Sequence, residues 1–352
     1  MLKNTQKYFL AANSCQGFVS EFESNCTNDY YTYIIKGGPG TGKSSFMKKV
    51  AEKVAQNGQK ITLCPCSSDP ESLDAVILED LKIIIIDGTA PHTLDPTYPA
   101  VTQEILNFGE FWQGEKLKNK TEIIEITNQN KALHQTASRY LKAAGELLLD
   151  NQKTALACLN LKKCEGLAEK IVKTFFVEQC TIPKEKVRFL SGVTPKGYVD
   201  FCDNLTQNFE NLVIIEDDFL KASHHILNTL REKALQNGYE ITTLKNPLLP
   251  NVIDHLLIPK LSLAVVSENR FTHFNSKIRR IHSRRFYDNR LLHQSKNRIK
   301  FNNRLCRELL ESAYFTLNEA KLVHDQLEKH YISAMNFEKL NNFADMFCKN
   351  NL

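Results

Sequence analysis

Apolar and polar residues alternate along the first part of the chain in a way that predicts short strands separated by helices. Strands are expected at about 8–12 and 33–36, the second rich in the β-branched and aromatic residues that suit a pleated surface. Between 44 and 56, apolar residues recur on one face at helical spacing. Further strands are expected at 61–64 and 82–86.

The last of these strands is apolar throughout, from Ile83 to Ile86. Such a run is typical of a strand in a parallel sheet that is covered on both faces. A mostly helical stretch is expected after it, from about 101 to 176. Strands that alternate with helices, followed by a long helical region, indicate an α/β fold with a parallel sheet and an attached helical layer.

An internal repeat extends over most of the chain. Lys7-Tyr-Phe-Leu10 returns as Val187-Arg-Phe-Leu190, and Gln56-Asn-Gly58 returns as Gln236-Asn-Gly238, both at a spacing of 180 residues. Further pairs at this spacing are Ile61 and Ile241, Asp74 and Asp254, and Leu81 and Leu261.

In the helical regions the spacing falls to 176, as between Ala137 and Ala313. A connector with Pro183 and several charges lies at 179–186. The sequence therefore predicts a tandem duplication with two domains, 1–182 and 183–352.

The strongest motif is Gly37-Gly-Pro-Gly-Thr-Gly-Lys-Ser44, which fits the phosphate-loop pattern G-x-x-x-x-G-K-[ST] and lies between an expected strand and an expected helix. Glycines let the backbone N–H groups point into one concavity, at the positive end of the helix. Lys43 is expected to reach the β- and γ-phosphates, and the Ser44 hydroxyl to ligate Mg²⁺. The expected nucleotide-binding residues are Gly38, Pro39, Gly40, Thr41, Gly42, Lys43, Ser44 and Ser45.

A phosphate loop needs an acid for the metal, and Asp87 at the end of the apolar strand supplies it. The next residue is Gly88, where many motor ATPases carry the glutamate that polarises the attacking water. Asp69 and His92 follow neighbouring strands, whose carboxyl ends meet at one edge of a sheet. Both are candidate catalytic residues, Asp69 to position water or substrate and His92 to contact the γ-phosphate; a turn acid and a loop histidine are the alternatives.

The second copy lacks these residues. Ser223 stands at the position of Lys43, His224 at that of Ser44, and Ser267 at that of Asp87. In addition, Asp217 and Asp218 would repel a triphosphate. The second copy is therefore expected to keep the fold as a degenerate domain without a nucleotide.

Composition is that of a globular protein, with 352 residues, 42% hydrophobic and 24% charged, so a disordered chain is excluded. The net charge of +5 is concentrated: the segment from Lys277 to Arg307 holds eleven Lys or Arg against one acid, Asp288. Three interpretations stay open for this segment. The first is a solvated helix face, the second is a surface that binds nucleic acid or another polyanion, and the third is a source of an arginine directed at the phosphates near Lys43.

No apolar run is long enough for a membrane helix, and the first ten residues do not resemble a secretory signal. The ten cysteines are scattered, which favours reduced thiols in the cytoplasm. Only Cys64-Pro-Cys66 is closely spaced, and without a second Cys or His pair it does not by itself predict zinc.

The duplicated unit, the glycine-rich loop, Cys66-Ser-Ser-Asp69 and Asp87-Gly-Thr-Ala-Pro-His92 together resemble an uncharacterised family of bacterial tandem P-loop ATPases. The resemblance covers nearly the whole chain. It implies ATP and Mg²⁺ as ligands and ATP hydrolysis as the activity, at a single N-terminal site because the second copy is degenerate. Two alternatives are a small-molecule or nucleotide kinase and a non-catalytic, nucleotide-dependent switch that binds nucleic acid.

Overall fold

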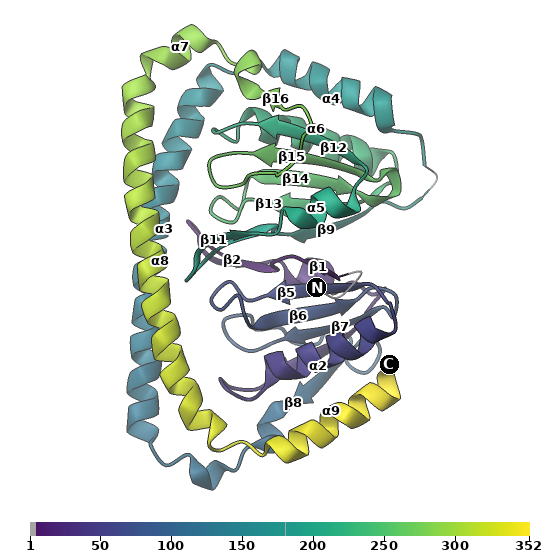
Figure 1. The fold of residues 1–352 in the computed structure, drawn as a ribbon, viewed down its shortest axis with the longest axis vertical. Coiled ribbons are helices and arrows are strands. Elements are labelled where there is room, and N and C mark those ends of the chain that lie inside the picture. The colour runs from purple at the N-terminus through teal and green to yellow at the C-terminus, as the bar shows by residue number, and fades with distance from the viewer. Residues whose placement is uncertain (1–4, 180) are drawn as a thin grey trace.

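The computed structural model describes residues 5–179 and 181–352 and has an α/β architecture with two six-stranded sheets. The two sheets lie one beyond the other, and a pair of long helices runs along the same side of both (Figure 1). We call each sheet with the helices on its faces a lobe, the first lobe carrying the N-terminal sheet. The α/β class expected from the sequence is confirmed.

The first sheet has the strand order β1-β5-β6-β7-β4-β8. Five strands run in one direction, and β6 is antiparallel to both of its neighbours. The strands are β1 (Thr5–Lys7), β4 (Tyr31–Lys36), β5 (Ile61–Pro65), β6 (Leu73–Leu78), β7 (Ile83–Asp87) and β8 (Gln103–Asn107).

Three sequence-based predictions for this sheet need correction. The apolar strand β7 lies in a mixed sheet and not in a wholly parallel one, because the unpredicted strand β6 pairs with it in the antiparallel sense. The region after 101 begins with strand β8, which pairs with β4, before the helices start. The strand expected at 8–12 is two short strands, β1 and β2 (Ala11–Ser14), with 8–10 between them. Direction and pairing depend on partners distant in sequence, which a local apolar pattern does not encode.

The second sheet has the order β16-β12-β15-β14-β13-β9, which repeats that of the first sheet with equivalent strands in equivalent places. Here β14 is the antiparallel strand. The strands are β9 (Lys184–Arg188), β12 (Asn211–Glu216), β13 (Glu240–Lys245), β14 (Ile253–Ile258), β15 (Leu263–Glu268) and β16 (Ile281–His282).

Two hairpins lie between the sheets: β2 with β3 (Gly17–Ser20), and β10 (Ser191–Thr194) with β11 (Gly197–Asp200). Phe9 and Phe189 exchange two backbone hydrogen bonds of 2.9 Å each and are fully buried. These two residues are also equivalent in the sequence repeat. A residue that pairs with its own repeat equivalent lies on a pseudo-twofold axis between the lobes.

The helices complete the fold. The expected helix at 44–56 is α2 (Lys43–Gln56), and its equivalent is α6 (Ala222–Gln236). The long helices α3 (Lys120–Ala157) and α8 (Lys296–Ile332) lie side by side and antiparallel (Figure 1). The others are α1 (Phe22–Asn25), α4 (Leu161–Phe175), α5 (Asp203–Asn208), α7 (Asn289–Gln294), α9 (Phe337–Asn351) and the 3₁₀ turns η1 (Phe108–Phe111), η2 (Gly114–Lys116), η3 (Pro259–Leu261) and η4 (Ser283–Phe286).

The two halves exchange their last helices. Helix α9, at the end of the chain, packs on the first lobe, where Leu340 and Phe347 share a core with Phe46 of α2. Helix α4, from the first half of the chain, packs on the second lobe, where Ala168 shares a core with Leu230 of α6. Each lobe therefore contains residues from both sides of the 182/183 boundary. The division into domains 1–182 and 183–352 stays a prediction.

Within residues 5–179 and 181–352, no helix combines the length and the apolar composition that crossing a membrane requires. The cysteines in this part of the chain are all free thiols.

Candidate functional site

The segment 37–42, which we call the glycine loop, joins the end of β4 to the start of α2. Gly40 and Gly42 have left-handed backbones, with φ of 64° and 82°. Only glycine adopts such angles without strain. The loop therefore turns tightly and delivers the chain into α2 with the free N–H groups of the first helical turn at its mouth.

Elements from the second half of the chain cover the glycine loop. A Cβ on Gly40 would lie 2.9 Å from the Glu328 carbonyl oxygen on α8, and one on Gly42 would lie 2.8 Å from a methyl group of Leu340 on α9. The Gly40 N–H donates a hydrogen bond of 3.2 Å to the Glu328 carboxylate. The Glu328 carboxylate thus binds the Gly40 N–H, one of the groups that the sequence analysis expects to bind phosphate.

Lys43, in the first turn of α2, folds back over the loop. Its Nζ donates to the carbonyl oxygens of Gly37 at 3.1 Å and Gly38 at 2.7 Å. The same atom lies 3.6 Å from Oδ2 of Asp87, and both side chains are about nine-tenths buried, with exposed fractions of 13% and 14%. The lysine and the aspartate predicted as partners are therefore brought together.

The neighbouring hydroxyl and carboxylate are oxygen ligands of the type that Mg²⁺ prefers. Oγ of Ser44 accepts a hydrogen bond of 3.0 Å from the Leu73 N–H, at the start of β6. Oδ1 of Asp87 accepts from the Thr89 N–H at 2.9 Å, which leaves Oδ2 toward Lys43. This donor set fits a Mg²⁺ ion held by Ser44 and Asp87.

The other loop residues have supporting positions. The Thr41 hydroxyl is buried and donates to the Gly38 carbonyl at 2.8 Å, which closes the loop from inside. Pro39 stands in the loop between Gly38 and Gly40, and Ser45 is exposed in the first turn of α2.

Asp69 stands in the turn between β5 and β6. Its carboxylate accepts from the Ser72 hydroxyl at 2.8 Å and lies 3.6 Å from Nζ of Lys321 on α8. Asp69 therefore stabilises its own turn and links that turn to α8, as expected for the turn acid that the sequence left as an alternative. Its catalytic role stays a prediction.

His92 is buried between the rings of Phe18 and Phe22, with ring centroids 4.9 and 5.0 Å away. Its Nε2 lies 3.5 Å from Oδ1 of Asp74. Asp74 is one residue beyond the pair of Ala75 with Ile86, a register that places it opposite Asp87 across β6 and β7. The sequence analysis did not identify Asp74 as a site residue, although Asp74 recurs as Asp254 in the internal repeat.

Asp74 is electrostatically part of this site. Burial raises the pKa of its carboxyl group above the ordinary value, His92 and Lys43 act to lower it, and Asp87 acts to raise it. Asp74 thus responds to both members of the pair at the glycine loop. We group Lys43, Ser44, Asp74, Asp87 and His92 as the residues of one site.

Comparison with known proteins assigns no family to this arrangement. No family model, curated protein or solved structure matches the chain. The functional argument therefore depends on the residues themselves.

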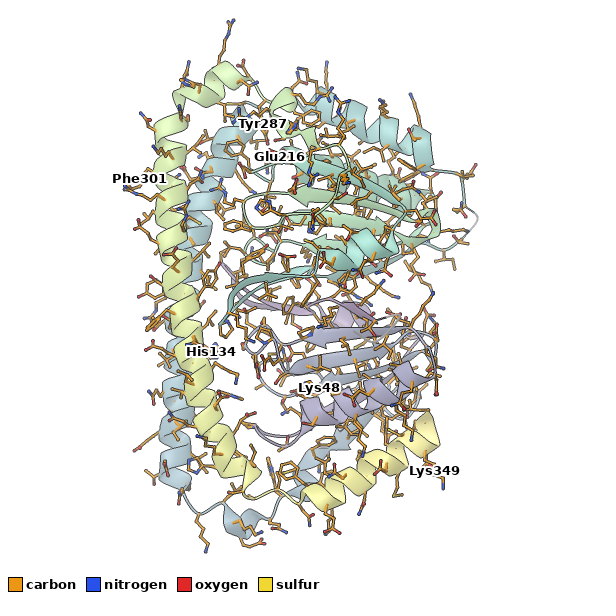
Figure 2. All side chains as sticks on the ribbon, in the orientation of Figure 1. Lys48, His134, Glu216, Tyr287, Phe301 and Lys349 are labelled. Atoms are coloured by element: carbon orange, nitrogen blue, oxygen red, sulfur yellow. The ribbon has the colours of Figure 1, made fainter. Side chains whose placement is uncertain are left out.

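In the second lobe, the loop that corresponds to the glycine loop binds a carboxylate of the protein itself. Asp217 is fully buried, and its carboxylate accepts hydrogen bonds from the N–H groups of Ser223 at 2.9 Å and Phe219 at 3.2 Å, and from the Tyr287 hydroxyl at 3.2 Å. Figure 2 labels Tyr287 in the second lobe, where it stands between η4 and the start of α7. Ser223 and Ser267, at the positions of Lys43 and Asp87, are joined by a hydrogen bond of 3.3 Å. The predicted loss of the lysine and its acid partner leaves a buried site closed by Asp217.

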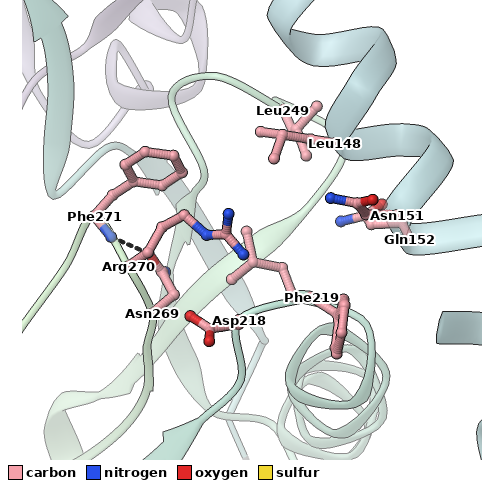
Figure 3. Close-up of a pocket in the computed structure, with 10 residues that line it drawn as sticks. Leu148, Asn151, Gln152, Asp218, Phe219, Leu249, Asn269, Arg270 and Phe271 are labelled. Carbon is pink, nitrogen blue, oxygen red and sulfur yellow. Dashed lines mark hydrogen bonds between the residues drawn. The ribbon is translucent and has the colours of Figure 1, made fainter. Parts of the chain in front are cut away.

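The segment 217–222 corresponds to the glycine loop at the spacing of 180, and we call it the second loop. It keeps part of the backbone path of the glycine loop. Leu220, equivalent to Gly40, has a left-handed φ of 55°. Beside it lies a small pocket, drawn in Figure 3, between Asp218, Arg270 and the α3 residues Leu148 and Gln152. Gln152 is equivalent to Glu328 at the helical spacing of 176, and it lines this pocket together with Leu220.

The basic segment 277–307 lies on the second lobe, at the end of the molecule away from α2 (Figure 1). It forms β16, η4, α7 and the start of α8, and Asn160 at the start of α4 donates to the Phe286 carbonyl at 2.8 Å. An arginine from this segment directed at Lys43 is therefore excluded. Lys321, farther along α8, instead lies near Asp69 of the first lobe. The segment and α4 line a groove with Lys163, Lys170, Arg279, Arg280, His282 and Arg285 on its walls.

Proposed function

We propose that the protein binds MgATP at the glycine loop of the first lobe and hydrolyses it. The observation that carries the proposal is the approach of Lys43 to Asp87, at 3.6 Å, beside a glycine loop with two left-handed glycines at the start of a helix. A lysine and an acid in these positions supply the phosphate-binding charge and the metal ligand of a P-loop nucleotide site.

Binding would replace contacts that the chain makes with itself. Nζ of Lys43, now on the carbonyls of Gly37 and Gly38, would turn to the β- and γ-phosphates, and the loop N–H groups would cradle the phosphate oxygens. Ser44 and Asp87 would hold Mg²⁺, which bridges β- and γ-phosphate oxygens and neutralises developing charge. The Gly40 N–H would exchange the Glu328 carboxylate for a phosphate oxygen.

We further propose that the chain is a tandem duplication of a P-loop unit with one active site. The equal strand order of the two sheets and the pairing of Phe9 with Phe189 support the duplication. The buried Asp217 supports a single site, since an anion there would meet a carboxylate already bonded to the loop N–H groups.

Isothermal titration with MgATP tests the proposal. The wild-type chain should bind one ATP, and Lys43→Ala should lose binding, whereas Lys53→Ala, an exposed lysine on the same helix, should bind as the wild type does. Two equivalent ATP sites, or unaltered binding by Lys43→Ala, would contradict it. Release of inorganic phosphate with ATP alone supports a hydrolase; phosphate found only on an added acceptor supports the kinase, and binding without turnover the switch.

The basic groove favours a polyanion as a second ligand, and we propose that this is the backbone of a single-stranded nucleic acid. Lys170 on α4 and Arg285 on η4 both line the groove. Lys170→Glu with Arg285→Glu should lower binding to single-stranded oligonucleotides and reduce the dependence of log K on log salt by about 1.4. Lys173→Glu, exposed on α4 outside the groove, is the matched control. Equal affinity and salt dependence for all three proteins would identify the groove as a solvated face.

A further inference from the structure

Three side chains from separate parts of the first lobe meet beside the glycine loop. Cys66 directly follows β5, Asp74 is in β6, and His92 is in the loop after β7. One potential ligand atom from each, a sulfur, a carboxylate oxygen and a ring nitrogen, lies within 4.8 Å of the other two. Asp74 and His92 are more than nine-tenths buried, whereas Cys66 is partly exposed. We call these residues the Cys-Asp-His cluster.

The spacing within the cluster is that of ligands around an ion. Nε2 of His92 and Oδ1 of Asp74 are 3.5 Å apart, too far for a good hydrogen bond. Two nitrogen or oxygen ligands at bond lengths of about 2.0–2.1 Å on a tetrahedral ion lie about 3.3 Å apart. The histidine and the aspartate are therefore held near the edge length of a coordination tetrahedron.

Two buried polar atoms in the cluster have no hydrogen-bond partner: Oδ2 of Asp74 and Nδ1 of His92. Unpaired buried polar atoms are costly and call for an explanation. An ion bound by Nε2 of His92 and by the Asp74 carboxylate would satisfy Oδ2 of Asp74, whereas Nδ1 of His92 would keep no partner. The geometry around them is nevertheless fixed. The rings of Phe18 and Phe22 hold the imidazole, and the Ser68 N–H donates to Sγ of Cys66 at 3.4 Å. Burial and the neighbouring Asp74 carboxylate raise the pKa of the Cys66 thiol, and the Ser68 contact offsets this only in part, so a metal ion would have to displace the thiol proton.

The second lobe shows what the fold requires of these positions. The equivalents of Cys66, Asp74 and His92 are Asn246, Asp254 and Thr272. The local backbone is the same, since the N–H of Cys66 bonds to residue 72 and that of Asn246 to residue 252, while His92 and Thr272 both bond three residues back.

In the second lobe, the Asn246 side-chain amide donates to Oδ2 of Asp254 at 2.9 Å, so Asn246 supplies a polar partner at the position of Cys66, while Oδ1 of Asp254 has no hydrogen-bond partner. The fold keeps the aspartate but does not need the cysteine or the histidine. Those two differ between the lobes together with Lys43 and Asp87, which marks them as part of the function of the first lobe.

We propose that the Cys-Asp-His cluster binds one divalent transition-metal ion of the zinc class, with Cys66, Asp74 and His92 as ligands and a fourth position open. A sulfur and an imidazole ligand select such an ion over Mg²⁺, which prefers oxygen. The site adjoins the nucleotide site, because Asp74 interacts electrostatically with Lys43 and Asp87. It is distinct from the Mg²⁺ position at Ser44, and its occupancy does not depend on ATP.

Titration of the chelator-treated, untagged full chain with Co²⁺, without nucleotide, tests the site. One Co²⁺ should bind and produce both the visible bands of a tetrahedral ion and a sulfur-to-cobalt charge-transfer band. Binding of Co²⁺ should release the thiol proton, and equimolar Zn²⁺ should then abolish both bands by displacing the cobalt. Cys66→Ser should lose the charge-transfer band, and His92→Gln should weaken binding by more than the roughly 10- to 100-fold that loss of an outer-shell partner costs.

Cys64→Ser, two residues away and outside the cluster, should keep the wild-type spectrum, and circular dichroism shows whether each variant is folded. The only other group of metal-ligating side chains in the described residues, His324, Asp325 and Glu328, contains no sulfur and cannot give the charge-transfer band. Failure of Co²⁺ to bind the wild type, or a charge-transfer band that persists in folded Cys66→Ser, would overturn the proposal. Neither result bears on ATP binding, which is measured separately.

Discussion

The contact between Glu328 and the glycine loop predicts that the protein restrains its own affinity for ATP. The Glu328 carboxylate accepts from the Gly40 N–H at 3.2 Å, so a phosphate oxygen must displace it. We expect Glu328→Gln, which keeps the size and removes the charge, to bind MgATP more tightly than the wild type.

The magnitude follows from the contact. A hydrogen bond to a charged group contributes about 1.5–3 kcal/mol, against about 0.5–1.5 kcal/mol for a neutral one. The Glu328 side chain is 34% exposed, so screening lowers the difference. The substitution also removes the repulsion between the carboxylate and the triphosphate. We therefore expect the free energy of MgATP binding to become more favourable by about 1–2 kcal/mol, which lowers Kd about five- to thirtyfold.

Calorimetry with a non-hydrolysable ATP analogue and Mg²⁺ measures this gain. Glu311→Gln is the matched control, because Glu311 is exposed on the same helix and distant in sequence from the loop contact. The gain should shrink as salt increases. Equal or weaker binding by Glu328→Gln than by the wild type would refute the competition, while a wild type that binds no ATP would refute the proposed function itself.

Three further predictions concern stability. In denaturant titrations, Gly40→Ala should lower the free energy of unfolding more than Gly58→Ala does. Both glycines have left-handed backbones, which costs about 1–2 kcal/mol for alanine. Of these two positions, only Gly40 would bring the new Cβ against a backbone oxygen, at 2.9 Å. Tyr287→Phe should cost about 1–3 kcal/mol on thermal unfolding without changing ATP binding, because the buried Asp217 carboxylate loses a donor; unchanged stability would contradict this. Burial raises the pKa of Asp254 to about 7, so between about pH 4 and 7 the native state holds a proton that the unfolded chain has lost, and stability from this group falls as pH rises. Asp254→Asn should therefore gain stability relative to the wild type across that range, and a constant difference would exclude the shift.

The glycine loop and Asp87 stand at the ends of elements that can be predicted from the sequence, because both depend on local signals. Lys43 and Asp87 each stand at the end of a regular element that the apolar pattern marks, and the closeness of the two follows from the pairing of β4 with β7. The sequence also predicts that Ser223 and Ser267 replace them. It does not predict that Asp217 turns inward to occupy the loop, because a charged residue carries no local signal of burial.

What the sequence misses depends on contacts between distant segments. In the sequence, Asp74 is a single acid within an apolar run. Only the antiparallel pairing of β6 with β7 places it opposite Asp87. Glu328 reads as one of many charges on a long helix, and only the packing of α8 against the loop gives it a role. The amphipathic pattern of α9 predicts a buried face without stating which sheet that face covers.

The exchange of α4 and α9 bears on how such a chain can change over time. A half that has lost its phosphate-binding residues could be deleted if it folded apart from the other half. Here deletion would also remove α9, whose Leu340 contacts the glycine loop and whose Phe347 completes the core beneath α2. A substitution in the loop of the second lobe leaves these contacts in place, whereas a truncation that removes the second half would also open the core of the first lobe.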